Sequence, residues 1–143
     1  MDSQRVSDEL EIAALLSAYA RAVDTKDWQL YRSVFTDDAH IDYSADVFTG
    51  SLDGAIEFFD GDFSALVTMS MHYITNIESS IDGDTAQVRA MYYNPTRFSG
   101  AAETATFGGY YYHDLVRTPN GWRSRSLREE MIWTVNSPRA GQA

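Results

Sequence analysis

The sequence predicts an α+β domain in which a long N-terminal helix lies across a curved antiparallel sheet. Two observations support this fold class. Apolar residues recur at helical spacing in the first third of the chain, and strand-like segments separated by turn residues fill the second half. Helices followed by a run of strands are typical of α+β domains. At 143 residues, the chain is expected to form one domain, residues 1–143.

The first helix is expected over residues 8–23. Asp8, with Glu11 three positions later, resembles a capping box. One apolar stripe follows at helical spacing and comprises Ile12, Leu15, Leu16, Tyr19, Ala22 and Val23. Asp24 stands where this stripe ends. A second short helix is expected in DWQLYRSVF, with Asp27 as its N-cap.

The next segments alternate between strand and helix signals before a meander begins. TDDA is expected to end the second helix, and residues 39–43 to form the first strand. Residues 52–67 predict a helix that is broken near Gly61. From residue 70, four strand-like segments are joined by the turn IDGD, a turn near Gly100 and the turn TPNG, which favours antiparallel pairing.

Composition narrows the classes of partner. A net charge of -10 disfavours nucleic acids and anionic membrane surfaces, which attract basic faces. The absence of cysteine excludes disulfides, thiolate catalysis and zinc–thiolate sites. The polar start MDSQRVSDEL and the lack of long apolar runs predict a cytoplasmic protein. The nine Tyr, seven Phe and three Trp leave two interpretations open, a ligand cavity or a core and oligomer interface that use aromatic rings.

Three histidines are the candidates for acid–base chemistry. His40 begins a strand and is expected at the surface, while His113, in the aromatic strand YYYHD, can face either a pocket or solvent. His72 lies among apolar residues, where the residues alone favour a core histidine. No two histidines share a metal-ligand spacing, so no metal is expected. Nucleophile elbows, P-loops and GxGxxG motifs are absent from the sequence.

Three segments together resemble the SnoaL-like branch of the NTF2-like superfamily: YARAVDTKDWQLYRSVFTDDAHIDY, MHYITN and GGYYYHDLVRTPNGW. The similarity extends from about residue 8 to 135 and is greatest toward scytalone dehydratase, bile-acid dehydratase and hexachlorocyclohexane dehydrochlorinase. The resemblance implies a cone-shaped fold, a curved sheet wrapped on the long helix. It also implies a catalytic dyad of Asp24 and His72, assisted by Tyr19 and Tyr43.

Further pocket residues are expected on the later strands. An Arg on the last strand assists catalysis in some of these relatives, and Arg128 is the candidate here. Asn76, Tyr92, Tyr111 and His113 are the other residues expected to line the pocket.

The resemblance implies a lyase that needs no cofactor and carries out a dehydratase-type elimination on a small, hydrophobic, oxygenated molecule. An imidazole has a solution pKa of about 6.5 and can take a proton at neutral pH, while an adjacent carboxylate fixes its tautomer. Two alternatives stay open: an isomerase or cyclase of the ketosteroid-isomerase or polyketide-cyclase type, and a non-catalytic binding module. Relatives of this type associate as dimers or trimers, so a homo-oligomer is expected.

Overall fold

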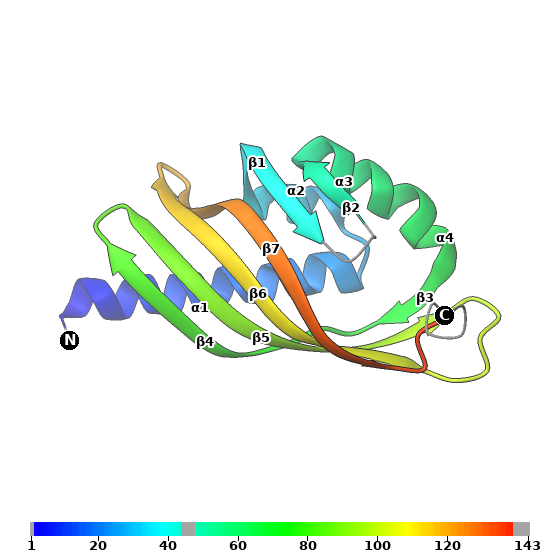
Figure 1. Cartoon of the computed structure of the whole chain (residues 1–143). Helices are drawn as coiled ribbons and strands as arrows, with labels where there is room; N and C mark the ends of the chain where they lie inside the picture. The colour runs from blue at the N-terminus through cyan, green and yellow to red at the C-terminus, as the bar shows by residue number, and fades with distance from the viewer. Residues whose placement is uncertain (1, 44–47, 139–143) are drawn as a thin grey trace.

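The computed structural model describes residues 2–43 and 48–138. Four helices, one of them a single turn, and a π-helical segment accompany seven strands. Their order along the chain is α1 Ser3–Asp24, α2 Trp28–Val34, β1 Phe35–Tyr43, β2 Phe48–Ser51, α3 Leu52–Phe58, the π-helical segment Phe59–Phe63, α4 Ser64–Leu66, β3 Val67–Ser70, β4 Tyr73–Asp82, β5 Thr85–Phe98, β6 Ala105–Thr118 and β7 Gly121–Val135. Figure 1 shows α1 lying across one face of the curved meander, with α3 and α4 toward the end where β3 lies.

The long helix starts earlier than the sequence predicts. Asp2, and not Asp8, is the N-cap, and its side chain accepts a hydrogen bond from the backbone N–H of Arg5. Asp8 is buried one turn further on, where it bonds residues of the sheet. The predicted apolar stripe is confirmed, because all six of its residues are buried. Asp27 caps α2 as predicted, by accepting from the N–H of Leu30.

The broken helix over residues 52–67 is also confirmed, and the break is a π-helical segment. Hydrogen bonds widen at Phe59–Phe63, between α3 and α4. The segment buries Phe59, whose ring stacks on Trp28 of α2 with centroids 5.2 Å apart. A π-helical turn changes the direction in which the following side chains point, and here the Phe59 ring points into the core.

The sheet is mixed and not purely antiparallel. Its strand order is β2-β1-β7-β6-β5-β3, and β4 also pairs with β5. The meander β4–β7 is antiparallel, as predicted from its tight turns, but β1 runs parallel to β7. No hairpin joins β1 to β7, so turn chemistry does not set its direction. TDDA, expected to be a helix end only, forms part of β1.

Alternation along β5, β6 and β7 separates an inner face, which covers α1, from an outer face. Val88, Tyr111 and Leu127 belong to the inner face and are at most 3% exposed. Their neighbours Arg89, Tyr112 and Arg128 belong to the outer face, because successive side chains of a strand point to opposite sides. This division decides which candidate residues can reach the dyad.

Candidate functional site

Asp24 and His72 lie in direct contact. The Asp24 Oδ1 atom is 2.6 Å from Nδ1 of His72, and its Oδ2 atom accepts a hydrogen bond from the backbone N–H of the same residue at 2.7 Å. Asp24 ends α1, and His72 lies in the short connection between β3 and β4. The His72 side chain is 6% exposed and that of Asp24 is 18% exposed. Two contacts to one carboxylate fix both the ring and its backbone.

Two side chains that sequence reasoning did not single out hold this connection in place. The Lys26 ammonium donates to the carbonyl oxygens of Ser64 and Val67, which ties the end of α1 to the start of β3. The Asn94 amide on β5 donates to Ser70 Oγ and to the Met71 carbonyl, directly before His72. The geometry of the dyad therefore depends on a strand that carries neither of its members.

The predicted tyrosines Tyr19 and Tyr43 lie together beside the dyad. Their hydroxyl oxygens are 2.7 Å apart, and Tyr31, which the sequence analysis did not propose, adds a third hydroxyl 2.8 Å from that of Tyr43. The Tyr19 ring meets the His72 ring edge to face at 6.4 Å. Burial raises the pKa of Tyr19 and Tyr43 well above its usual value. These phenols therefore keep their protons at neutral pH and can donate hydrogen bonds.

The meander adds Tyr92, Tyr111 and His113 to the same interior, and all three are at most 4% exposed. Tyr111 stacks on Tyr92 at 4.5 Å and lies 6.5 Å from the His72 ring. The sequence left open whether His113 faces a pocket or solvent, and the structure places its side chain on the inner face of the sheet. All three side chains, of Tyr92, Tyr111 and His113, thus point toward the interior, in the direction that the sequence predicted.

His113 is held as a neutral imidazole. Its Nδ1 lies 2.9 Å from Ser124 Oγ, and that hydroxyl donates its own proton to the Ser126 carbonyl. Nδ1 therefore carries the proton, and Nε2 is a bare acceptor that has no hydrogen-bond partner among the described residues. Burial lowers the pKa of His113 to about 4.

Two of the predicted pocket residues do not face the dyad. The Arg128 guanidinium lies on the outer face, 4.2 Å above the centre of the Tyr112 ring. Asn76 is exposed at an irregularity of the β4–β5 pairing and has a positive φ of 52°, so its side chain does not follow the inward alternation. The register of the final strand and a local bulge decided these directions, and neither is encoded in a short motif.

Glu129, and not Arg128, occupies the inner face of β7 near the dyad. It pairs with Tyr111 across the strands, two residues after the buried Leu127. Burial raises the pKa of Glu129, while a hydrogen bond from the Tyr92 hydroxyl acts to lower it. Sequence alternation alone could not have found it, because Trp122 shares a face with Leu127 and Glu129 only through the bulge between Ser124 and Ser126.

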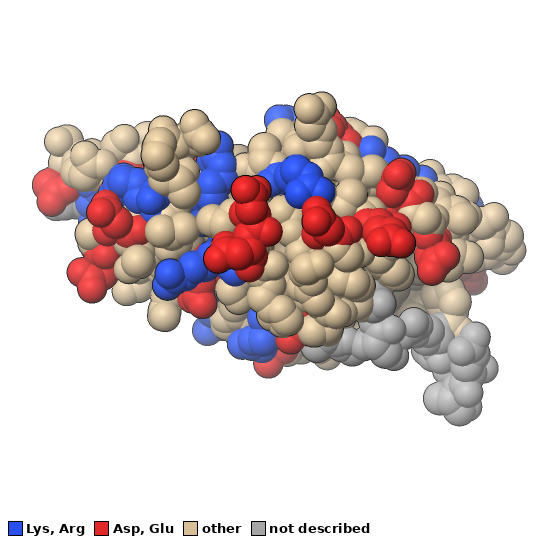
Figure 2. Space-filling view, turned by 90° about the horizontal axis from the view of Figure 1, so that it is seen from above, with Lys and Arg blue, Asp and Glu red and all other residues tan. Residues whose placement is uncertain are grey.

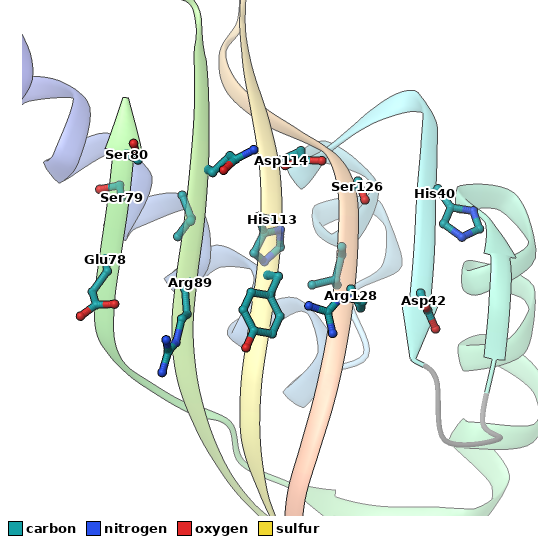
Figure 3. A pocket seen from close by; sticks show the side chains of 14 residues that line it. His40, Asp42, Glu78, Ser79, Ser80, Arg89, His113, Asp114, Ser126 and Arg128 are labelled. Atoms are coloured by element: carbon teal, nitrogen blue, oxygen red, sulfur yellow. The ribbon is translucent and has the colours of Figure 1, made fainter. Parts of the chain in front are cut away.

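Two hollows lined by described residues do not contain the dyad. The larger has a volume of about 590 Å³ and lies on the outer face, between β4 and β1. Figure 3 shows Arg89, Arg128 and Glu78 along it, with His40 and Asp42 on β1. The smaller, about 250 Å³, lies between α1 and β7.

No group of three or more His, Asp or Glu side chains among the described residues is arranged to hold a metal ion. No helix in the described ranges has both the length and the apolar character needed to cross a membrane. Figure 2 shows acidic and basic side chains interspersed on the face that it presents.

Several known proteins are similar to this chain. An uncharacterised protein of Mycobacterium tuberculosis is 38% identical over 122 residues, which is 82% of this chain and 81% of that protein. A crystal structure from Novosphingobium aromaticivorans, provisionally named an aromatic ring hydroxylase, is 31% identical with a TM-score of 0.83 and covers 92% of this chain and 94% of its own.

Two further structures show the same fold at lower identity. A provisionally named scytalone dehydratase, also from Novosphingobium aromaticivorans, has a TM-score of 0.87 at 16% identity and covers 96% of this chain and 92% of its own. A type 2 hexachlorocyclohexane dehydrochlorinase has a TM-score of 0.85 at 18% identity, covering 94% and 92%. The SnoaL-like domain family matches residues 4–128, and the chain therefore belongs to the SnoaL-like family of the NTF2-like fold.

Proposed function

We propose that this protein is a cofactor-independent lyase that removes a proton from carbon beside a carbonyl or activated ring and expels a neighbouring hydroxyl or similar group. The observation that carries the proposal is the 2.6 Å contact between Asp24 and Nδ1 of His72. A carboxylate at Nδ1 selects the tautomer whose Nε2 is unprotonated, and it stabilises the imidazolium that forms when Nε2 takes a proton. This is the arrangement that a carbon base requires.

The proton-bearing tyrosines supply the second part of the mechanism. As the C–H bond breaks, negative charge gathers on the carbonyl oxygen of the substrate. Tyr19 or Tyr43, directly or through a water molecule, donates a hydrogen bond to that oxygen. The ring-lined interior favours a flat, hydrophobic and oxygenated substrate, such as a polyketide, phenolic or steroid-like compound. The dehydratase and dehydrochlorinase names of two structural relatives agree with an elimination.

Solvent-deuterium exchange tests the proton-abstraction step without knowledge of the natural substrate. The wild-type protein is incubated in heavy water with a panel of aryl ketones and phenols, and exchange of the acidic C–H is followed by NMR. His72→Ala is expected to reduce exchange by roughly 10²–10⁴-fold. His40→Ala is the matched control, because His40 is exposed on β1. Exchange that is unchanged in His72→Ala, or absent from wild type for every compound, contradicts the proposal.

The same experiment separates elimination from isomerisation. Release of water or an anion indicates a lyase, whereas retention of the label within a rearranged product indicates an isomerase or cyclase.

A binding module without catalysis is the second candidate, and one observation favours it. Tyr19, Tyr43, Tyr92 and Tyr111 are each at most 5% exposed, and both hollows lined by described residues lie away from the dyad. A chain of this kind would bind ligand without exchange activity. The exchange experiment therefore decides between the two candidates.

The proposal includes a second copy of the chain on the outer face. Tyr73, Tyr93 and Trp133 form an exposed aromatic row, with ring centroids 5.8 Å and 6.0 Å apart. Gly108 makes the row possible, because a side chain there would overlap the Trp133 indole. The adjoining groove carries both charge signs, Arg89 and Arg128 with Glu78, so it can complement itself across a two-fold axis. Light scattering of wild type and Trp133→Ser distinguishes a dimer or trimer from a monomer.

A further inference from the structure

We infer that Glu129 is the proton donor of the site, delivering its carboxyl proton to the departing oxygen while His72 removes the proton from carbon. This inference rests on the proposed lyase function and adds to it the residue that makes hydroxide a viable leaving group.

The placement of Glu129 relative to the dyad is set by the sheet. Its cross-strand partner is Tyr111, whose ring lies 6.5 Å from His72 on one side and stacks on Tyr92 at 4.5 Å on the other. Glu129 therefore faces the same interior as the dyad, from β7, whereas His72 precedes β4. An acid and a base on two sides of one substrate are what an elimination of water needs.

The surroundings of Glu129 raise the pKa of its carboxyl group. The titratable groups that influence it are the Tyr92 phenol on β5, His72 before β4 and Asp42 on β1. Burial dominates and raises the pKa of Glu129, although Tyr92 and His72 act in the other direction. The Tyr92 hydroxyl beside Glu129 is also buried, and burial raises its pKa, so this phenol keeps its proton.

The reaction balances without a further reagent. His72 Nε2 takes the proton from carbon, the C–H electron pair becomes the new C=C bond, and the C–O bond breaks with its electrons on oxygen. The Glu129 proton converts that oxygen to water. The imidazolium then returns its proton to the Glu129 carboxylate through water, which restores both groups.

Two leaving groups separate the role of Glu129 from that of His72. The probes are the aldol adduct of benzaldehyde and acetone, which must lose hydroxide, and its acetate ester, which loses a stable carboxylate. Glu129→Gln is expected to slow dehydration of the aldol by roughly 10²–10⁴-fold. Elimination of the ester and deuterium exchange of the C–H are expected to stay close to wild type. Glu130→Gln is the matched control, since Glu130 is on the outer face and bonds Tyr112.

Each outcome has one meaning. Equal losses with aldol and ester, or no loss with either, overturn the donor role of Glu129. Exchange that survives in His72→Ala instead overturns the lyase proposal itself, so the two failures are distinguishable.

A carbon-13 NMR titration tests the acid directly. The Glu129 carboxyl signal is assigned by its loss in Glu129→Gln, and its midpoint is expected above the ordinary value of 4.5. A midpoint at or below that value overturns the inference, because the carboxyl would carry no proton at neutral pH.

Discussion

Near its two ends α1 carries one buried aspartate, Asp8, and one half-buried aspartate, Asp24, and the two bind different partners. Asp8 receives a bidentate pair of hydrogen bonds from Arg117, at 2.8 and 3.1 Å, and a third from the Trp122 indole. Hydrogen bonding to Arg117 holds the pKa of Asp8 well below its usual range. Asp24, about 24 Å further along the helix axis, faces a histidine among hydrogen-bonding tyrosines.

The difference gives a criterion for separating a structural carboxylate from one proposed to act in catalysis. At Asp8 the partner is a permanent cation that is also stacked on Trp122, so the pair fastens α1 to the β6–β7 hairpin. At Asp24 the partner can gain and lose a proton, and a carboxyl group with a raised pKa, Glu129, faces the same interior. The acid–base groups of the proposed mechanism lie beside the C-terminal end of α1.

The largest expected effect is that of Asp24→Asn. The amide cannot stabilise the imidazolium and favours the wrong ring tautomer, so exchange and turnover should fall by roughly 10³-fold or more. Circular dichroism and Tm should remain near wild type, because the amide can still accept from the His72 backbone N–H. If Asp24→Asn kept its exchange activity, Asp24 would have a structural role, as Asp8 has.

Acidification tests the interior beside the dyad. The unfolded His113 gains a proton near its ordinary pKa of 6.5, but the folded one does so only near 4. The unfolded state therefore binds more protons between these values, and the free energy of unfolding should decrease by roughly 3 kcal/mol as pH falls through this window. Denaturant titrations of wild type and His113→Gln measure it. Identical pH slopes for the two proteins would contradict the assignment.

Asp8→Ala should weaken the fold and spare the chemistry. It removes the partner of a guanidinium and of a buried indole N–H, and Tm should decrease by roughly 5–10 °C. Calorimetry measures the change. Deuterium exchange at a temperature where the variant is folded should match wild type, and a selective loss of exchange would break the proposed separation of the two ends.

The smallest expected effect is at Asn76. Its φ of 52° is a left-handed conformation that Asn tolerates better than Ala. Asn76→Ala should cost about 1 kcal/mol of unfolding free energy, whereas Asn76→Gly should be close to neutral. Exchange activity should be unchanged in both variants, because the residue is exposed and outside the interior. Loss of exchange activity in Asn76→Gly would show that Asn76 does belong to the site.

Local sequence signals predicted most of the framework. The 3.6-residue period of the α1 stripe, the Asp27 cap and the Asp-Gly and Asn-Gly turns each act within a few residues, and the structure contains each of them. The resemblance to SnoaL-like proteins named Asp24 and His72 as a pair, and their contact is now seen.

Tertiary structure decided what local signals cannot encode. β1 pairs in parallel with β7, a strand far away in the sequence to which no hairpin turn connects it. Glu129, and not Arg128, lies on the inner face because of a bulge between Ser124 and Ser126. One extra residue in a strand reverses every later side chain. Asp8 was predicted to be a helix cap because its actual partner, Arg117, is 109 residues away in the sequence and only folding brings the two together.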